Sequence, residues 1–138
     1  MRIFLDASVL IAGLAFRGSA HALLTEGFTS PHRFFASEDV RAETVRVLQE
    51  SFPRLAAEAE EAVGLVRAEW LPREAYARRL GDFPSLRDPH DAHVLAAAVS
   101  ARCGLLATWD KDLLSMGVVE GCRVVRPGEA LRFLRGGT

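Results

Sequence analysis

Residues 91–108 read DAHVLAAAVSARCGLLAT, and this stretch decides the fold. Its first part, from Asp91 to Arg102, is apolar on nearly every face when it is wound as a helix, which is typical of a buried helix. Gly104 ends that helix, because glycine readily adopts the backbone conformation that follows a last helical turn. Residues 105–108 then form a short apolar run that suits a buried parallel strand. The stretch predicts a central helix followed directly by a strand of a parallel sheet.

The same alternation of helix and strand extends outward in both directions. Further strands are expected at residues 2–6, 33–36 and 123–126, with a brief one at Trp70-Leu71. The expected helices cover residues 8–14, 20–27 after a Ser19 cap, 38–51 after a Ser37 cap, 53–69 from Pro53, 74–80 and 127–134. This pattern predicts an α/β fold, a sandwich with a mainly parallel central sheet, built from residues 1–138 as a single domain.

Four short acidic motifs are spread along the chain, and three of them lie at the border of an apolar run. Asp6 and Asp110 follow predicted strands, so both are expected at the carboxyl edge of the sheet, where ligands of open parallel sheets bind. Asp91 opens the central helix. Glu43 lies on the flank of its helix's apolar stripe, which places it at the border between core and solvent rather than on the open face. The six acids are Asp6, Glu43, Asp88, Asp91, Asp110 and Asp112.

Carboxylates crowded at one edge repel one another unless they share protons or bind a cation. Carboxylate oxygens with water are the ligands that Mg²⁺ and Mn²⁺ prefer, so the motifs indicate a divalent-metal site and hence phosphate chemistry. The hydroxyls of Ser8 and Thr108 flank this cluster and could hold a water or a phosphate oxygen. Arg87 and Lys111 lie within the motifs and are the best candidates for phosphate contacts.

Each of these residues, taken alone, also has an ordinary structural explanation. Asp6 or Ser8 caps a helix, Asp88-Pro89 starts one, and Glu43 is a solvated helix acid. The histidines beside the acids, His90 and His93, lack the further nitrogen or sulfur ligands of a zinc site. Trp109 could stack on a base, although half-buried packing at the strand end is the favoured explanation. The acids point to a site because four of them converge on one edge.

Composition narrows the class of protein. The formal net charge is −1, which gives no overall attraction to nucleic acid. The two cysteines, Cys103 and Cys122, form no disulfide framework, which fits a reducing cytoplasm. No apolar run reaches the roughly 20 residues that span a bilayer, so no membrane partner is expected. The phosphate-binding glycine loops, the serine nucleophile elbow and a cysteine nucleophile motif are all missing.

At its acidic motifs the chain resembles the PIN domain, the nuclease fold of VapC-type toxins, over nearly its whole length. The residues that carry the resemblance are Phe4-Leu5-Asp6-Ala7-Ser8, Ser37-Glu38-Asp39-Val40-Arg41-Ala42-Glu43, Asp91-Ala92-His93-Val94-Leu95-Ala96-Ala97-Ala98 and Thr108-Trp109-Asp110-Lys111-Asp112-Leu113-Leu114. Arg87-Asp88-Pro89-His90-Asp91 and Val124-Val125-Arg126-Pro127-Gly128-Glu129-Ala130 look closest to a branch of PIN-family toxin components. Trp109 departs from that branch, where a small or polar residue is commoner.

The resemblance implies a PIN-like nuclease domain that hydrolyses RNA with Mg²⁺ or Mn²⁺ and leaves a 5′-phosphate and a 3′-hydroxyl. It implies a catalytic tetrad of Asp6, Glu43, Asp91 and Asp110, with Asp6, Asp91 and Asp110 as metal ligands and Asp88 and Asp112 as auxiliary acids. It also implies an antitoxin protein as partner and a homodimer as a candidate assembly. Two alternatives stay open. One is a catalytically silent PIN-like module that binds RNA or protein. The other is an α/β phosphoryl-transfer enzyme with an aspartate nucleophile, although Ser8 stands where such enzymes usually carry a second aspartate.

Overall fold

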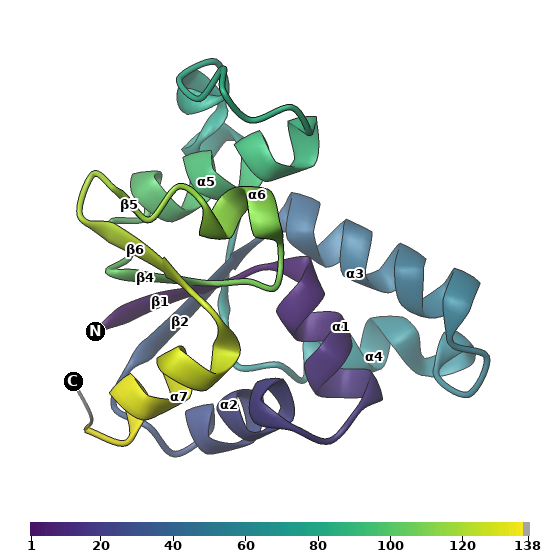
Figure 1. Cartoon of the computed structure of the whole chain (residues 1–138). Coiled ribbons are helices and arrows are strands. Elements are labelled where there is room, and N and C mark those ends of the chain that lie inside the picture. Colours follow the sequence, from purple (N-terminus) through teal and green to yellow (C-terminus); the bar gives the residue numbers. More distant parts are fainter. Residues whose placement is uncertain (137–138) are drawn as a thin grey trace.

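A computed structural model describes residues 1–136 of the chain, and its centre is a six-stranded sheet (Figure 1). The order of strands is β3 (Glu69–Leu71), β2 (Arg33–Ser37), β1 (Arg2–Leu5), β4 (Leu105–Ala107), β6 (Cys122–Val125) and β5 (Val118–Val119). All neighbouring strands are parallel except β5 and β6, which pair as an antiparallel hairpin. The predicted α/β fold with a mainly parallel sheet is therefore confirmed. The predicted domain of residues 1–138 ends two residues beyond the described part.

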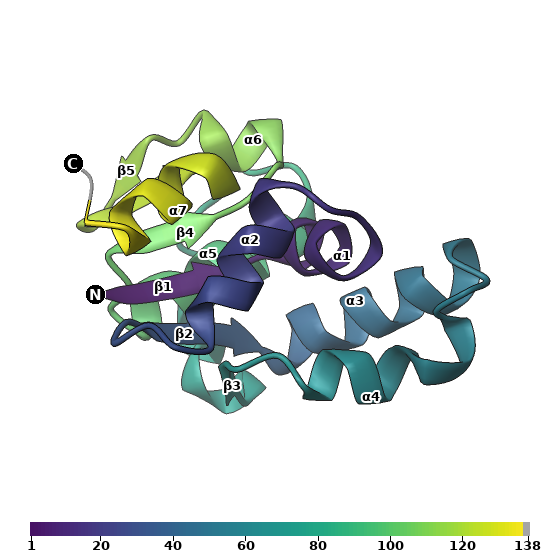
Figure 2. The ribbon, with the colours of Figure 1, turned by 90° about the horizontal axis from the view of Figure 1, so that it is seen from below.

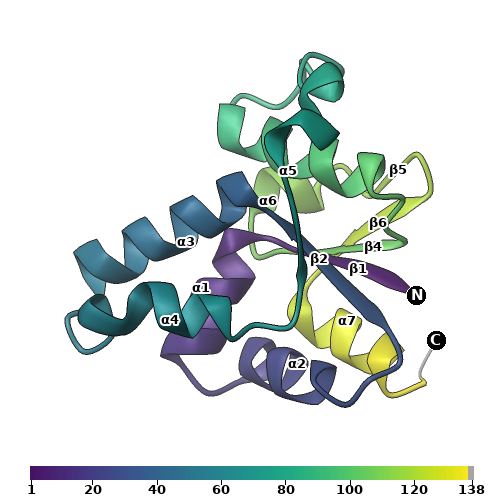
Figure 3. The ribbon, with the colours of Figure 1, turned by 180° about the vertical axis from the view of Figure 1, so that it is seen from behind.

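Helices cover both faces of the sheet. On one face lie α5 (Pro89–Ser100) and α6 (Lys111–Leu114), and on the other lie α2 (Ser19–Gly27) and α7 (Pro127–Leu134), which pack against each other (Figures 1 and 2). The remaining helices, α1 (Ala7–Ala15), α3 (Glu38–Ser51) and α4 (Ala59–Gly64), pack together beyond the carboxyl edge of the strands, where α3 and α4 form a projecting arm (Figure 3).

The central helix α5 has the buried character that its sequence predicts. Asp88 caps its first turn by accepting a hydrogen bond from the His90 amide at 2.9 Å, and Pro89 occupies the first helical position. Residues 94–98 are fully buried against the sheet. Because strand β1 is also buried on both faces, Ile3, Phe4 and Leu5 are shielded completely from solvent.

Two expected helices differ from those observed, and one expected cap is wrong. Residues 53–69 contain only a 3₁₀ turn (Ala56–Glu58) and α4, because the chain must reverse after α3 and return to β3. Residues 74–80 form two 3₁₀ turns (Arg73–Ala75 and Ala77–Arg79) in place of an α-helix. Ser19 is the first residue of α2 and does not cap it, since Gly18 takes the capping position without a side chain.

Within residues 1–136 no single helix is long and apolar enough to cross a membrane, and only the sharply bent pair α1 and α2 meets that criterion by length and composition.

Candidate functional site

Asp6 is the first residue beyond β1, and its carboxylate is held in place from three sides. Its Oδ1 atom accepts a hydrogen bond from the Ala7 amide at 2.7 Å, so Asp6 caps helix α1. Its Oδ2 atom accepts from Ser8 Oγ at 3.1 Å and from Thr108 Oγ1 at 2.7 Å. Asp6 is only 3% exposed. Asp6 can therefore cap helix α1 with one carboxylate oxygen and still belong to the candidate site.

The hydroxyls of Ser8 and Thr108 join the first acidic motif to the last. Ser8 Oγ accepts a hydrogen bond from the Trp109 amide at 3.0 Å, and Thr108 Oγ1 accepts from the Asp110 amide at 2.9 Å. These bonds fix the backbone of residues 108–110 against the end of β1. Both hydroxyls therefore lie beside the acids, as the sequence predicts, and position them through hydrogen bonds.

A second group of carboxylates gathers next to Asp6. Asp91, Asp110 and Asp112 each bring a carboxylate oxygen within 4.8 Å of the other two. Asp110 caps α6 by accepting a hydrogen bond from the Leu113 amide at 3.0 Å. Asp112, expected only as an auxiliary acid, is exposed and lies 3.9 Å from the guanidinium of Arg87. The geometry therefore makes Asp112 a candidate cation ligand together with Asp91 and Asp110.

Asp91 has the most unfavourable electrostatic environment of the group. It is 2% exposed, and within the described residues its side chain makes no hydrogen bond. Burial, together with the negative charges of Asp110, Asp88 and Asp6, raises the pKa of Asp91 to about 7. A divalent cation would relieve this repulsion, and the oxygen donors match what Mg²⁺ and Mn²⁺ prefer. The residues present therefore fit a divalent metal ion.

Glu43 reaches the same cleft from helix α3. A cavity of about 300 Å³ at the carboxyl edge of the sheet is lined by Asp6, Ala7, Ser8, Ile11, Glu43, Asp88, His90, Asp91, Trp109 and Asp110. The sequence pattern expects Glu43 at the border between core and solvent rather than on the open face, and its intermediate burial agrees with this expectation. The Glu43 side chain is 32% exposed, yet it lines the cleft, and it pairs with Arg46 on its own helix.

His90 is a cleft residue that the predicted site does not include. Its Nε2 atom lies 3.5 Å from Asp6 Oδ1, and it lines the cavity with the acids. The hydrogen bond to Asp6 raises the pKa of His90, and the negative charges of Asp6, Glu43 and Asp91 act in the same direction. Its position between Asp88 and Asp91 is the sequence signal that could have identified it.

The other predicted polar residues lie outside the cavity. His93 is half-buried, and its Nδ1 atom lies 3.2 Å from Asp39 Oδ2, an oxygen that also accepts a hydrogen bond from the Tyr76 hydroxyl. This agrees with a packing histidine. Arg87 and Lys111 are exposed beside the cleft, where Arg87 projects 89% of its side chain into solvent. Trp109, by contrast, lines the cavity and is 44% exposed, which agrees with a half-buried residue at the strand end.

The family model of the PIN domain matches residues 2–112 of this chain. None of the curated proteins matches it. Among solved structures, VapBC2 from Rickettsia felis, bound to a promoter DNA fragment, is similar over 91% of this chain and 98% of that chain, with a TM-score of 0.70 and 12% identity. VapBC-1 from nontypeable Haemophilus influenzae is similar over 92% and 98%, with a TM-score of 0.67 and 16% identity.

A third similar structure is Mycobacterium tuberculosis VapC20, described as a toxin that cleaves the sarcin-ricin loop. It is similar over 86% of this chain and 97% of that chain, with a TM-score of 0.61 and 22% identity. At these identities the three structures support the fold.

Proposed function

This chain belongs to the PIN-domain family, and on that premise we propose that it is a divalent-metal-dependent endoribonuclease, the toxin of a toxin–antitoxin pair. The observation that carries the proposal is one cleft that Asp6, Glu43, Asp91 and Asp110 line together. Four acids from four separate segments have no structural need to share a cavity. A buried aspartate with a pKa raised to about 7 is a further mark of a functional site.

The acids divide into a metal-holding group and a proton-accepting residue. Asp91, Asp110 and Asp112, with Asp6 beside them, would hold Mg²⁺ or Mn²⁺. When it is bound, the cation lowers the pKa of a water and offsets negative charge on the phosphoryl oxygens. Glu43 lines the same cleft but lies outside that group, and it accepts the proton of the attacking water.

The remaining side chains orient the substrate and the acids. Ser8 and Thr108 hold the Asp6 carboxylate, so its direction does not change when RNA enters. His90 brings an N–H group to the cleft beside Asp6, within reach of a phosphate oxygen. Arg87 and Lys111 contact phosphates outside the cleft, where both side chains are free to move in solvent. In-line displacement by water at the phosphorus leaves a 5′-phosphate and a 3′-hydroxyl.

The partners of the chain follow from the same proposal. Two of the similar structures are named as VapBC pairs rather than as VapC alone, which supports an antitoxin as the partner of this chain. We extend the proposal to a homodimer, to a cytoplasmic location, and to residues 1–138 as a single nuclease domain. The VapC20 description supports RNA as the substrate.

Cleavage of labelled RNA tests the proposed activity. Wild type, Asp6→Asn and Asp91→Asn are incubated with RNA in Mn²⁺, in Mg²⁺ and in chelator, and the product ends are mapped. Cleavage by wild type that both substitutions and the chelator abolish supports the proposal. The nuclease assignment fails if wild type leaves RNA intact in both metals, or if cleavage survives the chelator and the substitutions.

Expression in a bacterial host tests the toxin assignment separately. Wild type is expected to arrest growth, and Asp91→Asn is expected to permit it. Normal growth with soluble, active wild type would show a ribonuclease that is not a toxin.

A further inference from the structure

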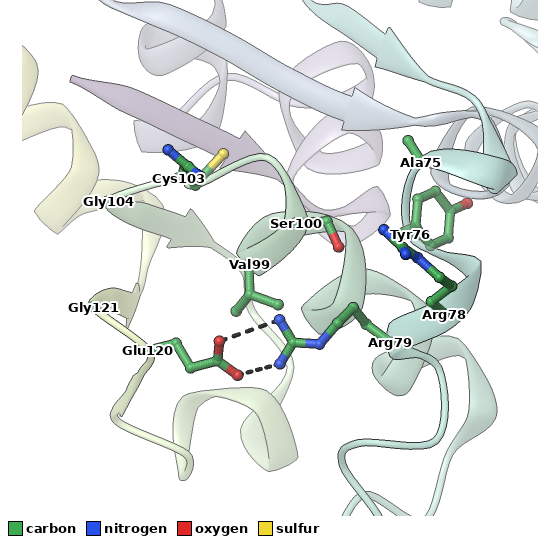
Figure 4. Close-up of a pocket in the computed structure, with 11 residues that line it drawn as sticks. Ala75, Tyr76, Arg78, Arg79, Val99, Ser100, Cys103, Gly104, Glu120 and Gly121 are labelled. Atoms are coloured by element: carbon green, nitrogen blue, oxygen red, sulfur yellow. Dashed lines mark hydrogen bonds and ion pairs between the residues drawn. The ribbon is translucent and has the colours of Figure 1, made fainter.

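A second cavity, of about 720 Å³, lies at the end of α5 opposite the acidic cleft (Figure 4). Its walls come from three places: residues 75–79, the last turn of α5 with the residues that follow it, and the turn between β5 and β6. It shares no lining residue with the acidic cleft. Its volume is within the range of about 300–1,000 Å³ that is typical of ligand sites.

Arginines dominate the charged groups of this cavity. Three arginines, Arg78, Arg79 and Arg102, line it against a single carboxylate, Glu120. Nη1 and Nη2 of Arg79 both donate hydrogen bonds to Glu120 (Figure 4), and Nε of Arg79 donates to Asp82. These two carboxylates offset the positive charge of Arg79. Arg78 and Arg102 are exposed, and neither forms an ion pair with a carboxylate in residues 1–136. Two positive charges are therefore left uncompensated.

Two charged residues at the rim of the cavity have a positive φ, a backbone conformation that favours glycine. Arg102 has a φ of 56° just after the last turn of α5, where the Cys103 amide donates to the Ala98 carbonyl at 3.0 Å. Glycine is usual at this position of a helix end. Glu120 has a φ of 50° in the tight turn of the β5–β6 hairpin. Within residues 1–136 these are the only non-glycine residues with positive φ, and strained residues of this kind cluster at ligand sites.

We propose that this cavity binds the phosphate backbone of the RNA substrate at a distance from the scissile bond. The inference rests on the proposed ribonuclease function. A guanidinium group binds phosphate through two parallel N–H bonds, and Arg78 and Arg102 have theirs free for that purpose. The chain as a whole carries a net charge of −1, so attraction for RNA must come from local basic surfaces.

The length of α5 sets the size of RNA that reaches both sites. Asp91 and Ser100 are nine residues apart on α5, about 14 Å along the helix axis. A stacked strand rises about 3.4 Å per nucleotide, so on the order of four nucleotides bridge this distance. The affinity for short oligonucleotides that fill only the acidic cleft should therefore not depend on Arg78 and Arg102, whereas the affinity for longer RNA should depend on them.

Fluorescence anisotropy on the full-length chain tests this, with a labelled RNA of about 12 nucleotides in chelator, over a range of KCl concentrations. The cavity variant is Arg78→Ala/Arg102→Gly, in which glycine suits the positive φ and preserves the fold. The matched control is Arg54→Ala/Arg132→Ala, which removes two exposed arginines that are likewise without ion pairs in the described chain and lie outside the cavity. Thermal unfolding verifies that all variants fold.

We expect the cavity variant to lose about 10- to 100-fold in affinity, and the slope of log affinity against log[KCl] to fall by roughly 1.4, about 0.7 for each lost phosphate contact. The control keeps nearly the wild-type slope. With Mn²⁺, the KM for the long RNA rises in the cavity variant, while kcat and the cleavage of a dinucleotide, which is too short to bridge the two sites, stay unchanged.

Equal losses in the cavity variant and the control would overturn the inference. The inference would also be overturned if the double substitution weakened the binding of a free nucleoside triphosphate but left RNA affinity unchanged. The same holds if it weakened only the binding of the antitoxin. Failure of the proposed function has a different signature. If wild type binds RNA through Arg78 and Arg102 but never cleaves it, the nuclease assignment fails and the binding site stands.

Discussion

Thr108 Oγ1 donates a 2.7 Å hydrogen bond to Asp6 Oδ2 and so joins residues that are 102 positions apart in the chain. The same hydroxyl accepts a hydrogen bond from the Asp110 amide. One buried side chain therefore connects the ends of the neighbouring strands β1 and β4 and fixes two of the candidate catalytic acids relative to each other.

Thr108→Val tests this connection, because valine preserves the shape and removes the hydroxyl. We expect the free energy of unfolding to fall by about 1–3 kcal/mol, since a buried carboxylate loses a donor and a partly buried amide loses its acceptor. RNA cleavage should fall at the same time, as Asp6 is no longer held. Urea unfolding and a cleavage assay measure the two effects.

Thr44→Val is the matched control. Thr44 is also fully buried, but its hydroxyl only donates to the Val40 carbonyl one turn back in α3, and Thr44 does not line the cleft. We expect a smaller loss of stability, about 0.5 kcal/mol, and unchanged cleavage. If the two variants are equally stable and equally active, the Thr108 hydroxyl does not organise the site.

The fold was largely predictable from sequence because its signals are local. Strands β1, β4 and β6 are apolar runs, and α5 is apolar all round and begins with an Asp-Pro pair. The errors occur where tertiary structure overrides local preference. Residues 53–69 are rich in Ala and Glu and favour a helix, yet the chain must turn there to reach β3. The β5–β6 hairpin was missed because Glu120 takes a turn conformation that usually belongs to Asn or Gly.

The candidate site was predictable in part. Asp6 and Asp110 were expected together because strand ends meet at one edge, and Asp91 because it opens the central helix, but their roles stay predictions. The direction of the Asp112 side chain depends on how the short helix α6 is oriented, and sequence spacing does not determine that orientation. The direction of His90 toward Asp6 depends in the same way on the start of α5.

The stability of the metal-free protein should fall as pH rises. The pKa of Asp91 is raised to about 7 in the folded state, from 3.8, so between about pH 4 and pH 7 the folded state holds more protons than the unfolded state. Stability is therefore lost as pH rises through this window. The raised pKa of His90 acts in the same direction above its unfolded value of 6.5.

Asp91→Asn should remove most of this dependence, because the amide stays neutral. In chelator at pH 8 we expect the variant to be more stable than wild type by on the order of 2–4 kcal/mol, and nearly equal to it at pH 4.5. Glu74→Gln, at an exposed acid outside the cleft, should follow wild type at both pH values. Urea titrations from pH 4.5 to 8 measure the difference, and a wild-type protein that gains stability over this range would contradict the assignment.

Asp112→Asn should weaken Mn²⁺ binding. Because Asp112 brings an oxygen within 4.8 Å of Asp91 and Asp110, its loss is expected to cost about 10- to 100-fold in affinity, measured by titration calorimetry at pH 8. Glu74→Gln serves again as the control and should bind as wild type does. The stabilisation of wild type by Mn²⁺ should also shrink at pH 5.5, where protons compete for Asp91. Unchanged affinity in Asp112→Asn would leave Asp112 as an outer acid only.

Glu43→Gln separates the chemistry of the cleft from its binding of metal and RNA. Glu43 lines the cleft but lies outside the Asp91, Asp110 and Asp112 group, so its removal should leave Mn²⁺ affinity nearly intact. As the proposed proton acceptor it should contribute about 10²- to 10⁴-fold to kcat. Helix α3 supplies a close control in Glu50, which pairs with the same Arg46 and does not line the cleft.

Glu50→Gln loses an exposed ion pair with the same Arg46 and should keep full activity, because solvent screens such a pair. A fall in kcat confined to Glu43→Gln, with RNA affinity unchanged in both variants, would identify Glu43 as a catalytic residue. Equal activity in the two variants would make Glu43 an ordinary helix acid that faces the cleft, and the proton would then have to leave through another of the carboxylates.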